Sequence, residues 1–194
     1  MELQWYDIRQ LDAAEEARIA AMMDDVRRRR VADIAGEDDR KRTVAGELLA
    51  RRMLAEKLHC SEADVPLTWD ELGKPTVTTE GTYVSVSHSG AWAVCIVVVA
   101  VGEKVLGVDV EVIRSTREKF MRRVCSEAEM ACIRPGDSGD CRRFWEVWTA
   151  KEALFKLMGK GPLLALSRLL LPVGVTLDYT EKNGCAVTVA AQIL

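Results

Sequence analysis

Apolar residues recur at helical spacing in three segments of the chain. Asp12, followed by Ala13-Ala14-Glu15, resembles a capping box and predicts a first helix that runs to the cluster Arg27–Arg30. Acidic residues at 37–39 mark the start of a second helix, where the helix dipole favours negative charge. The apolar stripe of this second helix is Val44, Leu48, Leu49, Met53, Leu54 and Leu58. A third helix is predicted from about Arg142 to Met158, ended by Gly159.

Strands are predicted between and after these helices. Tyr83–Ser87 is typical of a short strand, and Trp92–Val101 of a long buried one. Gly102-Glu103 is a plausible tight turn into a further strand, Val105–Ile113. The C-terminal segment alternates between apolar and polar residues on both sides of Asn183-Gly184, a strong hairpin signal.

The remaining segments are predicted as connections. Residues 66–75 and 134–139 contain proline and glycine and are expected to be loops, and Ser126–Glu129 resembles a second capping box. The order of helices, strands, helices and strands indicates an α+β fold. We expect two similar halves that meet near residues 102–107, although no internal sequence repeat supports this.

Composition narrows the function classes. The chain has 194 residues and a net charge of −3, so we expect no nucleic-acid partner, and any attraction to phosphate must be local. Its start lacks a basic region followed by an apolar run, and its longest apolar stretch, residues 91–101, is shorter than the roughly 20 residues of a membrane-spanning helix. We therefore expect a cytoplasmic protein, without membrane contact, whose six cysteines are reduced and mostly buried.

Asp109 and Glu111 are the first residues that suggest chemistry. Side chains alternate along a strand, so both carboxylates point to the same face, where they repel each other unless something neutralises them. The alternative is a solvated face of an edge strand. Leu106, Val108 and Val110 form an apolar opposite face and indicate a packed strand, which favours a cation or a cleft beside the carboxylates.

The third predicted helix carries Glu152 and Lys156 one turn apart, with Trp148 on the Glu152 side. The alternative is an ordinary surface ion pair on an amphipathic helix, worth about 0.2–0.5 kcal/mol. Three converging carboxylates with a lysine beside them would suit a divalent cation and a phosphate ligand. This combination indicates phosphoryl-transfer chemistry.

Two further segments suit an anion. Ser87-His88-Ser89-Gly90, at the end of a strand, offers hydroxyl and ring N–H donors, although a structural histidine or a nucleophilic Ser-His pair remain alternatives. A nucleophile would normally lie in a Gly-x-Ser-x-Gly elbow, which is absent. The basic runs Arg27–Arg30 and 40–42 lack interleaved aromatic residues, so a phosphate site fits them better than nucleic acid, while a solvated helix face remains open.

Taken in order, four motifs resemble the 4′-phosphopantetheinyl transferases of the surfactin-synthetase-activating type. The motifs are Gly-Lys-Pro at 73–75, Ser-His-Ser-Gly at 87–90, Gly-Val-Asp-Val-Glu at 107–111 and Trp-Thr-Ala-Lys-Glu-Ala-x-x-Lys at 148–156. The resemblance covers residues 27–161 and implies a pseudo-twofold pair of similar α+β subdomains, here residues 1–103 and 104–194, with coenzyme A between them. It also implies a monomer.

The resemblance implies an activity of the holo-[acyl-carrier-protein] synthase type. Such an enzyme transfers 4′-phosphopantetheine from coenzyme A to a serine of an apo acyl- or peptidyl-carrier protein, requires Mg²⁺ and releases adenosine 3′,5′-bisphosphate. Asp109, Glu111 and Glu152 would be the metal ligands, and Glu152, Lys156 and Asp109 the catalytic residues. Contacts to coenzyme A would come from Arg27, Arg30, Arg42, Thr43, Lys74, Ser87, His88, Lys151 and Lys156.

Two segments depart from the family pattern. Val124-Cys125 stands where aromatic residues are frequent, and Gly161 is followed by Pro162, so carrier docking is expected to differ more than the chemistry. Two other functions stay open: a coenzyme A or carrier-protein binding module without transferase activity, and a Mg²⁺-dependent nucleotide pyrophosphatase.

Overall fold

The computed structural model describes residues 2–71, 73–99, 104–133, 141–159 and 166–193. The chain divides into two compact units, Met1–Lys104 and Val105–Leu194. Each unit combines helices with a small three-stranded sheet, which confirms the predicted α+β class. Three predicted features lie outside the described residues: the turn at Gly102-Glu103, the loop at 134–139, and the departure at Gly161-Pro162.

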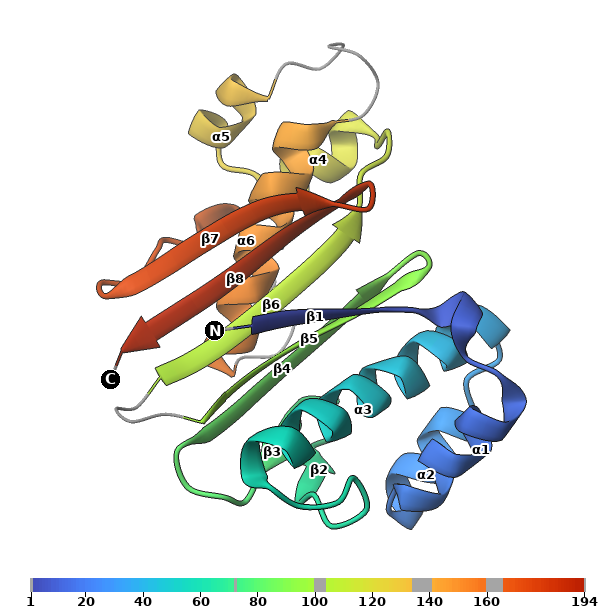
Figure 1. The fold of residues 1–194 in the computed structure, drawn as a ribbon. Coiled ribbons are helices and arrows are strands. Elements are labelled where there is room, and N and C mark those ends of the chain that lie inside the picture. The colour runs from blue at the N-terminus through green and yellow to red at the C-terminus, as the bar shows by residue number, and fades with distance from the viewer. Residues whose placement is uncertain (1, 72, 100–103, 134–140, 160–165, 194) are drawn as a thin grey trace. The chain divides into compact units, whose positions relative to one another are not determined.

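The first unit is built on a three-stranded sheet in the order β1-β5-β4. Its strands are β1 (Glu2–Asp7), β4 (Thr82–Ser89) and β5 (Trp92–Val99), and both neighbouring pairs are antiparallel. The long helix α3 (Glu37–Leu58) packs on β4 and β5 (Figure 1). The predicted apolar stripe is largely confirmed, because Val44, Leu48 and Leu54 are fully buried. β1 was not predicted.

The predicted first helix is in fact two helices, α1 (Ala13–Met22) and α2 (Asp25–Ala32). Met23 has extended backbone angles, and the Asp24 side chain accepts a hydrogen bond from the Arg27 N–H, which caps a new helix. Aspartate is a favoured N-cap residue, because its side chain can accept a hydrogen bond from a backbone N–H of the following helix. Asp24 therefore begins a new helix, although the apolar periodicity continues past it. Both helices contact α3.

The predicted loop at residues 66–75 contains strand structure. β2 (Leu67–Trp69) pairs with β3 (Pro75–Val77) in a separate two-stranded antiparallel sheet. Proline at the first residue of a strand is compatible with pairing, which is why the Pro75 signal did not exclude a strand here.

The second unit is built on a sheet in the order β6-β8-β7. Its strands are β6 (Lys104–Val112), β7 (Val175–Lys182) and β8 (Cys185–Ile193). Asn183 and Gly184 both have positive φ, as a tight hairpin turn requires, so the predicted hairpin is confirmed. Helix α6 (Arg142–Met158) has the predicted bounds and packs on β8 and β7 (Figure 1).

Two short helices complete the second unit. α5 (Glu127–Cys132) begins at the predicted capping box, in which Ser126 and Glu129 bond each other's backbone N–H groups. α4 (Glu118–Val124), before it, was not predicted. A single 3-10 turn occurs in each unit, at η1 (Ile8–Gln10) and η2 (Leu166–Arg168), among the described residues.

The two units share one topology. In each, a first strand (β1 or β6) precedes a long helix (α3 or α6), and a hairpin follows (β4–β5 or β7–β8). In each sheet the second hairpin strand is central, between the first strand and the other hairpin strand. The two halves are therefore similar in fold although the sequence shows no repeat. No helix in the described parts of the chain is both long and apolar enough to cross a membrane.

Candidate functional site

The two faces of β6 are unlike, as the alternation of its residues predicts. Val108 and Val110 are fully buried, and Leu106 nearly so, which confirms the apolar face. Asp109, on the other face, is only 5% exposed although β6 is an edge strand of its sheet. The interpretation of Asp109 as part of a solvated edge-strand face is therefore wrong.

Lys156 on α6 reaches this strand. Its ammonium donates to Asp109 Oδ1 at 2.8 Å and to the Val108 carbonyl at 3.0 Å. The interpretation of Lys156 and Glu152 as an ordinary surface ion pair therefore fails for Lys156, whose ion pair is with the buried aspartate of the strand. The contact joins the two motifs that the sequence separates by more than forty residues.

Glu152 lies in an acidic environment beside the same strand. Burial raises the pKa of Glu152 above its ordinary value, and the negative charges of Asp109 and Glu111 raise it further, while Lys156 lowers it. Glu152 and Glu111 are both half-buried. The three carboxylates are thus close enough to interact electrostatically, as expected of side chains that share one site.

The donor set suits a magnesium ion, since Mg²⁺ prefers carboxylate oxygens and phosphate oxygens and keeps part of its water shell. No three acidic, histidine or cysteine side chains among the described residues form a ready-made metal cage. A magnesium ion at these carboxylates would need further oxygen ligands, which a bound phosphate group or water could supply. The excess negative charge around Glu152 is the observation that favours a cation there.

Lys151 lies elsewhere on α6. It is 4% exposed, and its ammonium donates to the Val124 carbonyl at 2.8 Å, to Glu129 Oε2 at 2.6 Å and to the Leu166 carbonyl at 2.9 Å. An ammonium group has three protons, so these bonds use its full donor capacity. A contact of Lys151 with coenzyme A stays a prediction, and it would require the ammonium to give up one of these bonds.

In the first unit, Arg27 is held by a buried ion network. Its Nε lies 3.5 Å from Oε2 of the fully buried Glu47. The other carboxylate oxygen of Glu47, Oε1, accepts a hydrogen bond from Arg51 Nε at 2.9 Å. The Arg27 guanidinium also stacks on the Trp69 ring, 3.8 Å from the ring centroid. Burial lowers the pKa of Arg27, and the Glu47 carboxylate opposes this effect.

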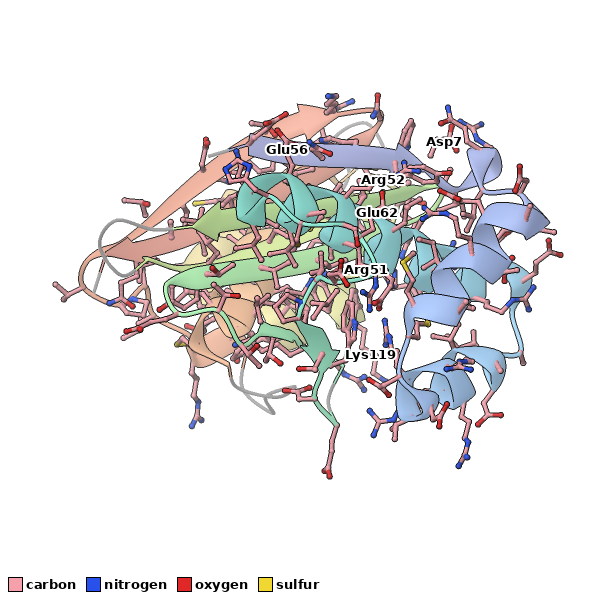
Figure 2. All side chains as sticks on the ribbon, turned by 60° about the horizontal axis from the view of Figure 1, so that its bottom comes forward. Asp7, Arg51, Arg52, Glu56, Glu62 and Lys119 are labelled. Carbon is pink, nitrogen blue, oxygen red and sulfur yellow. The ribbon has the colours of Figure 1, made fainter. Side chains whose placement is uncertain are left out.

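Figure 2 shows Arg51 and the neighbouring Arg52 on α3 together with Glu62. Arg51 donates to the Glu62 carbonyl at 3.1 Å, and Arg52 lies 3.4 Å from the Glu62 carboxylate. Arg51 is therefore held between the Glu47 carboxylate and the Glu62 backbone. The network in turn fixes the position of Arg27.

Arg30 and Lys74 meet at the β2–β3 turn. Arg30 Nη1 donates to the Asp70 carbonyl at 3.0 Å, and the Lys74 N–H donates to Asp70 Oδ1 at 2.8 Å. The structure therefore brings Arg27, Arg30 and the backbone of Lys74 to the same small hairpin, although the helix and the hairpin are far apart in sequence.

Arg42, Thr43 and His88 form a second group in the first unit. Arg42 donates to the Gly90 carbonyl at 2.7 Å and pairs with Asp39, whose pKa is lowered first by Arg42 and to a smaller extent by His88. Thr43 Oγ1 donates to the Asp39 carbonyl at 2.9 Å. His88 is exposed, whereas Ser87 is 6% exposed, as alternation along β4 dictates. The N-terminal part of α3 thus lies at the β4–β5 turn.

Sequence reasoning missed three residues that shape these groups: Glu47, Trp69 and Gly107. A charged residue inside the apolar stripe of α3, with Arg51 one turn later, was a signal for Glu47. Gly107 was visible as a glycine inside a predicted strand, which often marks close backbone approach. Nothing local identified Trp69, because its role depends on a helix about forty residues earlier in the chain.

Two family models match the chain. The model for the 4′-phosphopantetheinyl transferase superfamily matches residues 105–182, and that for the N-terminal part of 4′-phosphopantetheinyl transferases matches residues 12–100. A phosphopantetheinyl transferase of Thraustochytrium is 34% identical over 89% of this chain and 63% of its own length. The chain thus spans less than two thirds of that relative.

Two proteins of Bacillus subtilis match more of their own length. A 4′-phosphopantetheinyl transferase is 30% identical over 83% of this chain and 71% of its own, and the 4′-phosphopantetheinyl transferase Sfp is 25% identical over the same shares. The chain belongs to the 4′-phosphopantetheinyl transferases of the surfactin-synthetase-activating, or Sfp, type.

Proposed function

We propose that this protein transfers 4′-phosphopantetheine from coenzyme A to a serine of an apo acyl- or peptidyl-carrier protein, in the manner of a holo-[acyl-carrier-protein] synthase. Family membership supports phosphopantetheinyl transfer as the reaction class. The observation that carries the proposal within this chain is the group of Asp109, Glu152 and Lys156, in which a buried carboxylate, an acidic neighbour and an ammonium come together.

In the proposed reaction the serine oxygen forms a bond to the phosphorus that bears the pantetheine arm. The bond from that phosphorus to the bridging pyrophosphate oxygen breaks, and adenosine 3′,5′-bisphosphate leaves with the bonding electrons. The serine proton passes to a base. Glu152 suits this role because its raised pKa makes it a better proton acceptor than an ordinary surface glutamate.

Asp109, Glu111 and Glu152 would hold Mg²⁺, which when bound supplies charge neutralisation at the pyrophosphate. Lys156 would donate to a phosphate oxygen, since its ammonium is already fixed beside Asp109. Fixing this cation before the reaction stabilises charge that develops on the leaving oxygen without further reorganisation.

The first unit would supply most contacts to coenzyme A. Arg27 and Arg30 would bind the 3′-phosphate, and Arg42 with Thr43 would contact the adenine side. Lys74, Ser87 and His88 would hold phosphate oxygens. The buried network behind Arg27 supports its assignment, because a guanidinium fixed in advance loses less side-chain entropy when it binds a phosphate.

Product analysis separates this proposal from its two alternatives. A transferase should convert coenzyme A to adenosine 3′,5′-bisphosphate only when an apo carrier is present. A pyrophosphatase would release phosphopantetheine to water without a carrier, and a binding module would release nothing. Calorimetry of coenzyme A with and without Mg²⁺ adds a second criterion, since binding by a metal-assisted transferase should be tighter with the ion.

A further inference from the structure

Gly107 lies within β6, is buried, and faces the backbone of α6. A methyl group at this position would lie 2.0 Å from the Ala153 carbonyl oxygen and 2.6 Å from the Leu157 nitrogen. Both atoms belong to the helix backbone and cannot move by a change of rotamer. At this point the strand and the helix are therefore in direct backbone contact.

The residues at this contact are next to the proposed catalytic residues. Ala153 directly follows Glu152, and Leu157 directly follows Lys156. On the strand side, Val108 and Asp109, which Lys156 bonds, are the two residues after Gly107. The distance between β6 and α6 at Gly107 thus controls whether the Lys156 ammonium reaches Asp109.

We propose that Gly107 is a positioning residue for the transfer reaction: its missing side chain lets α6 approach β6 closely enough to place Lys156 and Glu152 beside Asp109. This inference rests on the proposed function. Glycine is needed here for space rather than for backbone conformation, because its φ is not among the positive values of the described glycines.

The displacement expected on substitution follows from the distances. Ordinary van der Waals contact begins at 3.4 Å, whereas the added methyl group would lie 2.0 Å from the Ala153 oxygen. The two backbones must therefore separate by about 1.4 Å (3.4 − 2.0). A misplacement of about 1 Å can lower the rate of a reaction about 10²-fold. We expect Gly107→Ala to lower kcat by about 10²-fold.

Gly46→Ala is the matched control. Gly46 lies on α3, the equivalent helix of the first unit, and a methyl group there would lie 2.8 Å from Val86 Cγ1, a side-chain atom. A side chain can give way more easily than a backbone, and alanine favours a helix interior. We expect Gly46→Ala to retain kcat within about twofold.

The test measures kcat, the KM for coenzyme A and the Mg²⁺ concentration for half activation, with circular dichroism to establish folding. For Gly107→Ala we expect lower kcat, a higher Mg²⁺ requirement and little change in KM, since the first-unit contacts are intact. In a double-mutant cycle, Gly107→Ala should lose part of its effect on kcat in the Lys156→Ala background, because only the displacement of Glu152 then remains to lower the rate. Wild-type kinetics in folded Gly107→Ala, or full additivity, would overturn the inference.

Should Gly107→Ala fail to fold, Ala190→Val provides a second test. Ala190 on β8 is fully buried in the cluster that contains Ala153, so a larger side chain there also pushes α6 away from its sheet. It must then produce the same lower kcat and higher Mg²⁺ requirement, and normal values would equally overturn the inference. Failure of the proposed function itself is distinct, since the unaltered chain would then modify no carrier.

Discussion

Replacing Lys151 by methionine separates a structural role of this residue from the predicted contact with coenzyme A. Methionine retains most of the aliphatic volume, so the substitution removes mainly the ammonium and its three hydrogen bonds. These bonds join α6 to the end of α4, to α5 through Glu129, and to η2. The structure predicts a large loss of stability.

The size of the stability loss follows from the Glu129 carboxylate, which loses its ion-pair partner. Breaking a buried ion pair costs about 3–5 kcal/mol. The Glu129 side chain is 31% exposed, so water can replace part of the interaction, and we take the lower end, about 3 kcal/mol. With a urea m-value of about 2 kcal/mol per M, the unfolding midpoint should fall by about 1.5 M.

Urea unfolding followed by tryptophan fluorescence measures this midpoint. Lys119→Met is the matched control, because Lys119 on α4 is exposed and the same chemical change there should alter stability by less than about 0.5 kcal/mol. Lys119 is labelled in Figure 2. A Lys151→Met midpoint equal to that of the control, together with weaker coenzyme A binding, would refute the structural role and support the ligand contact.

The Lys151 contact also has a pH signature. Burial tends to raise the pKa of Glu129, but hydrogen bonds from Lys151 and from the Ser126 N–H hold it below its ordinary value of 4.5. A lowered carboxyl pKa contributes stability that is present above the unfolded value and lost as the pH falls through the folded one. The difference between wild type and Lys151→Met should therefore shrink below about pH 4.5.

Three further predictions concern the proposed site. Glu152→Gln should raise the urea midpoint of the metal-free protein at pH 7, because a raised carboxyl pKa means that ionisation destabilises the fold, and the gain should vanish in midpoints measured below pH 4.5; an equal gain at both pH values would contradict the reasoning. Asp109→Ala should lower transfer at least about 10²-fold with the fold intact by circular dichroism, and normal turnover would remove Asp109 from the site. Arg30→Ala should weaken coenzyme A about 10-fold more than 3′-dephospho-coenzyme A in calorimetry, whereas the exposed Arg29→Ala should not discriminate; equal losses for both ligands would refute the 3′-phosphate contact.

Period-two alternation was sufficient to predict the faces of β6, because one face is apolar throughout and the other carries Asp109 and Glu111. It could not show that α6 covers the acidic face, since that depends on the absent side chain of Gly107 and on packing across the unit. The meeting of Lys156 with Asp109 therefore required the structure.

Other elements could not be predicted from the sequence for reasons specific to each element. Among the described strands, β1 pairs with β5 alone, about ninety residues later in the chain, so no neighbouring signal indicated it. The break between α1 and α2 depends on the capping hydrogen bond of Asp24, which competes with a continuing apolar pattern. Lys151 precedes Lys156 by five residues, about 140° around a helix, so the two lysines point to different surroundings despite sharing one motif.

The most direct test of the account is the intact mass of an apo carrier protein incubated with this chain, coenzyme A and Mg²⁺. We predict a single phosphopantetheine adduct on at least one member of a panel of acyl and peptidyl carriers, absent from a carrier whose target serine is replaced by alanine. Unchanged masses across the panel, with the wild-type chain shown to be folded, would contradict the proposed transfer.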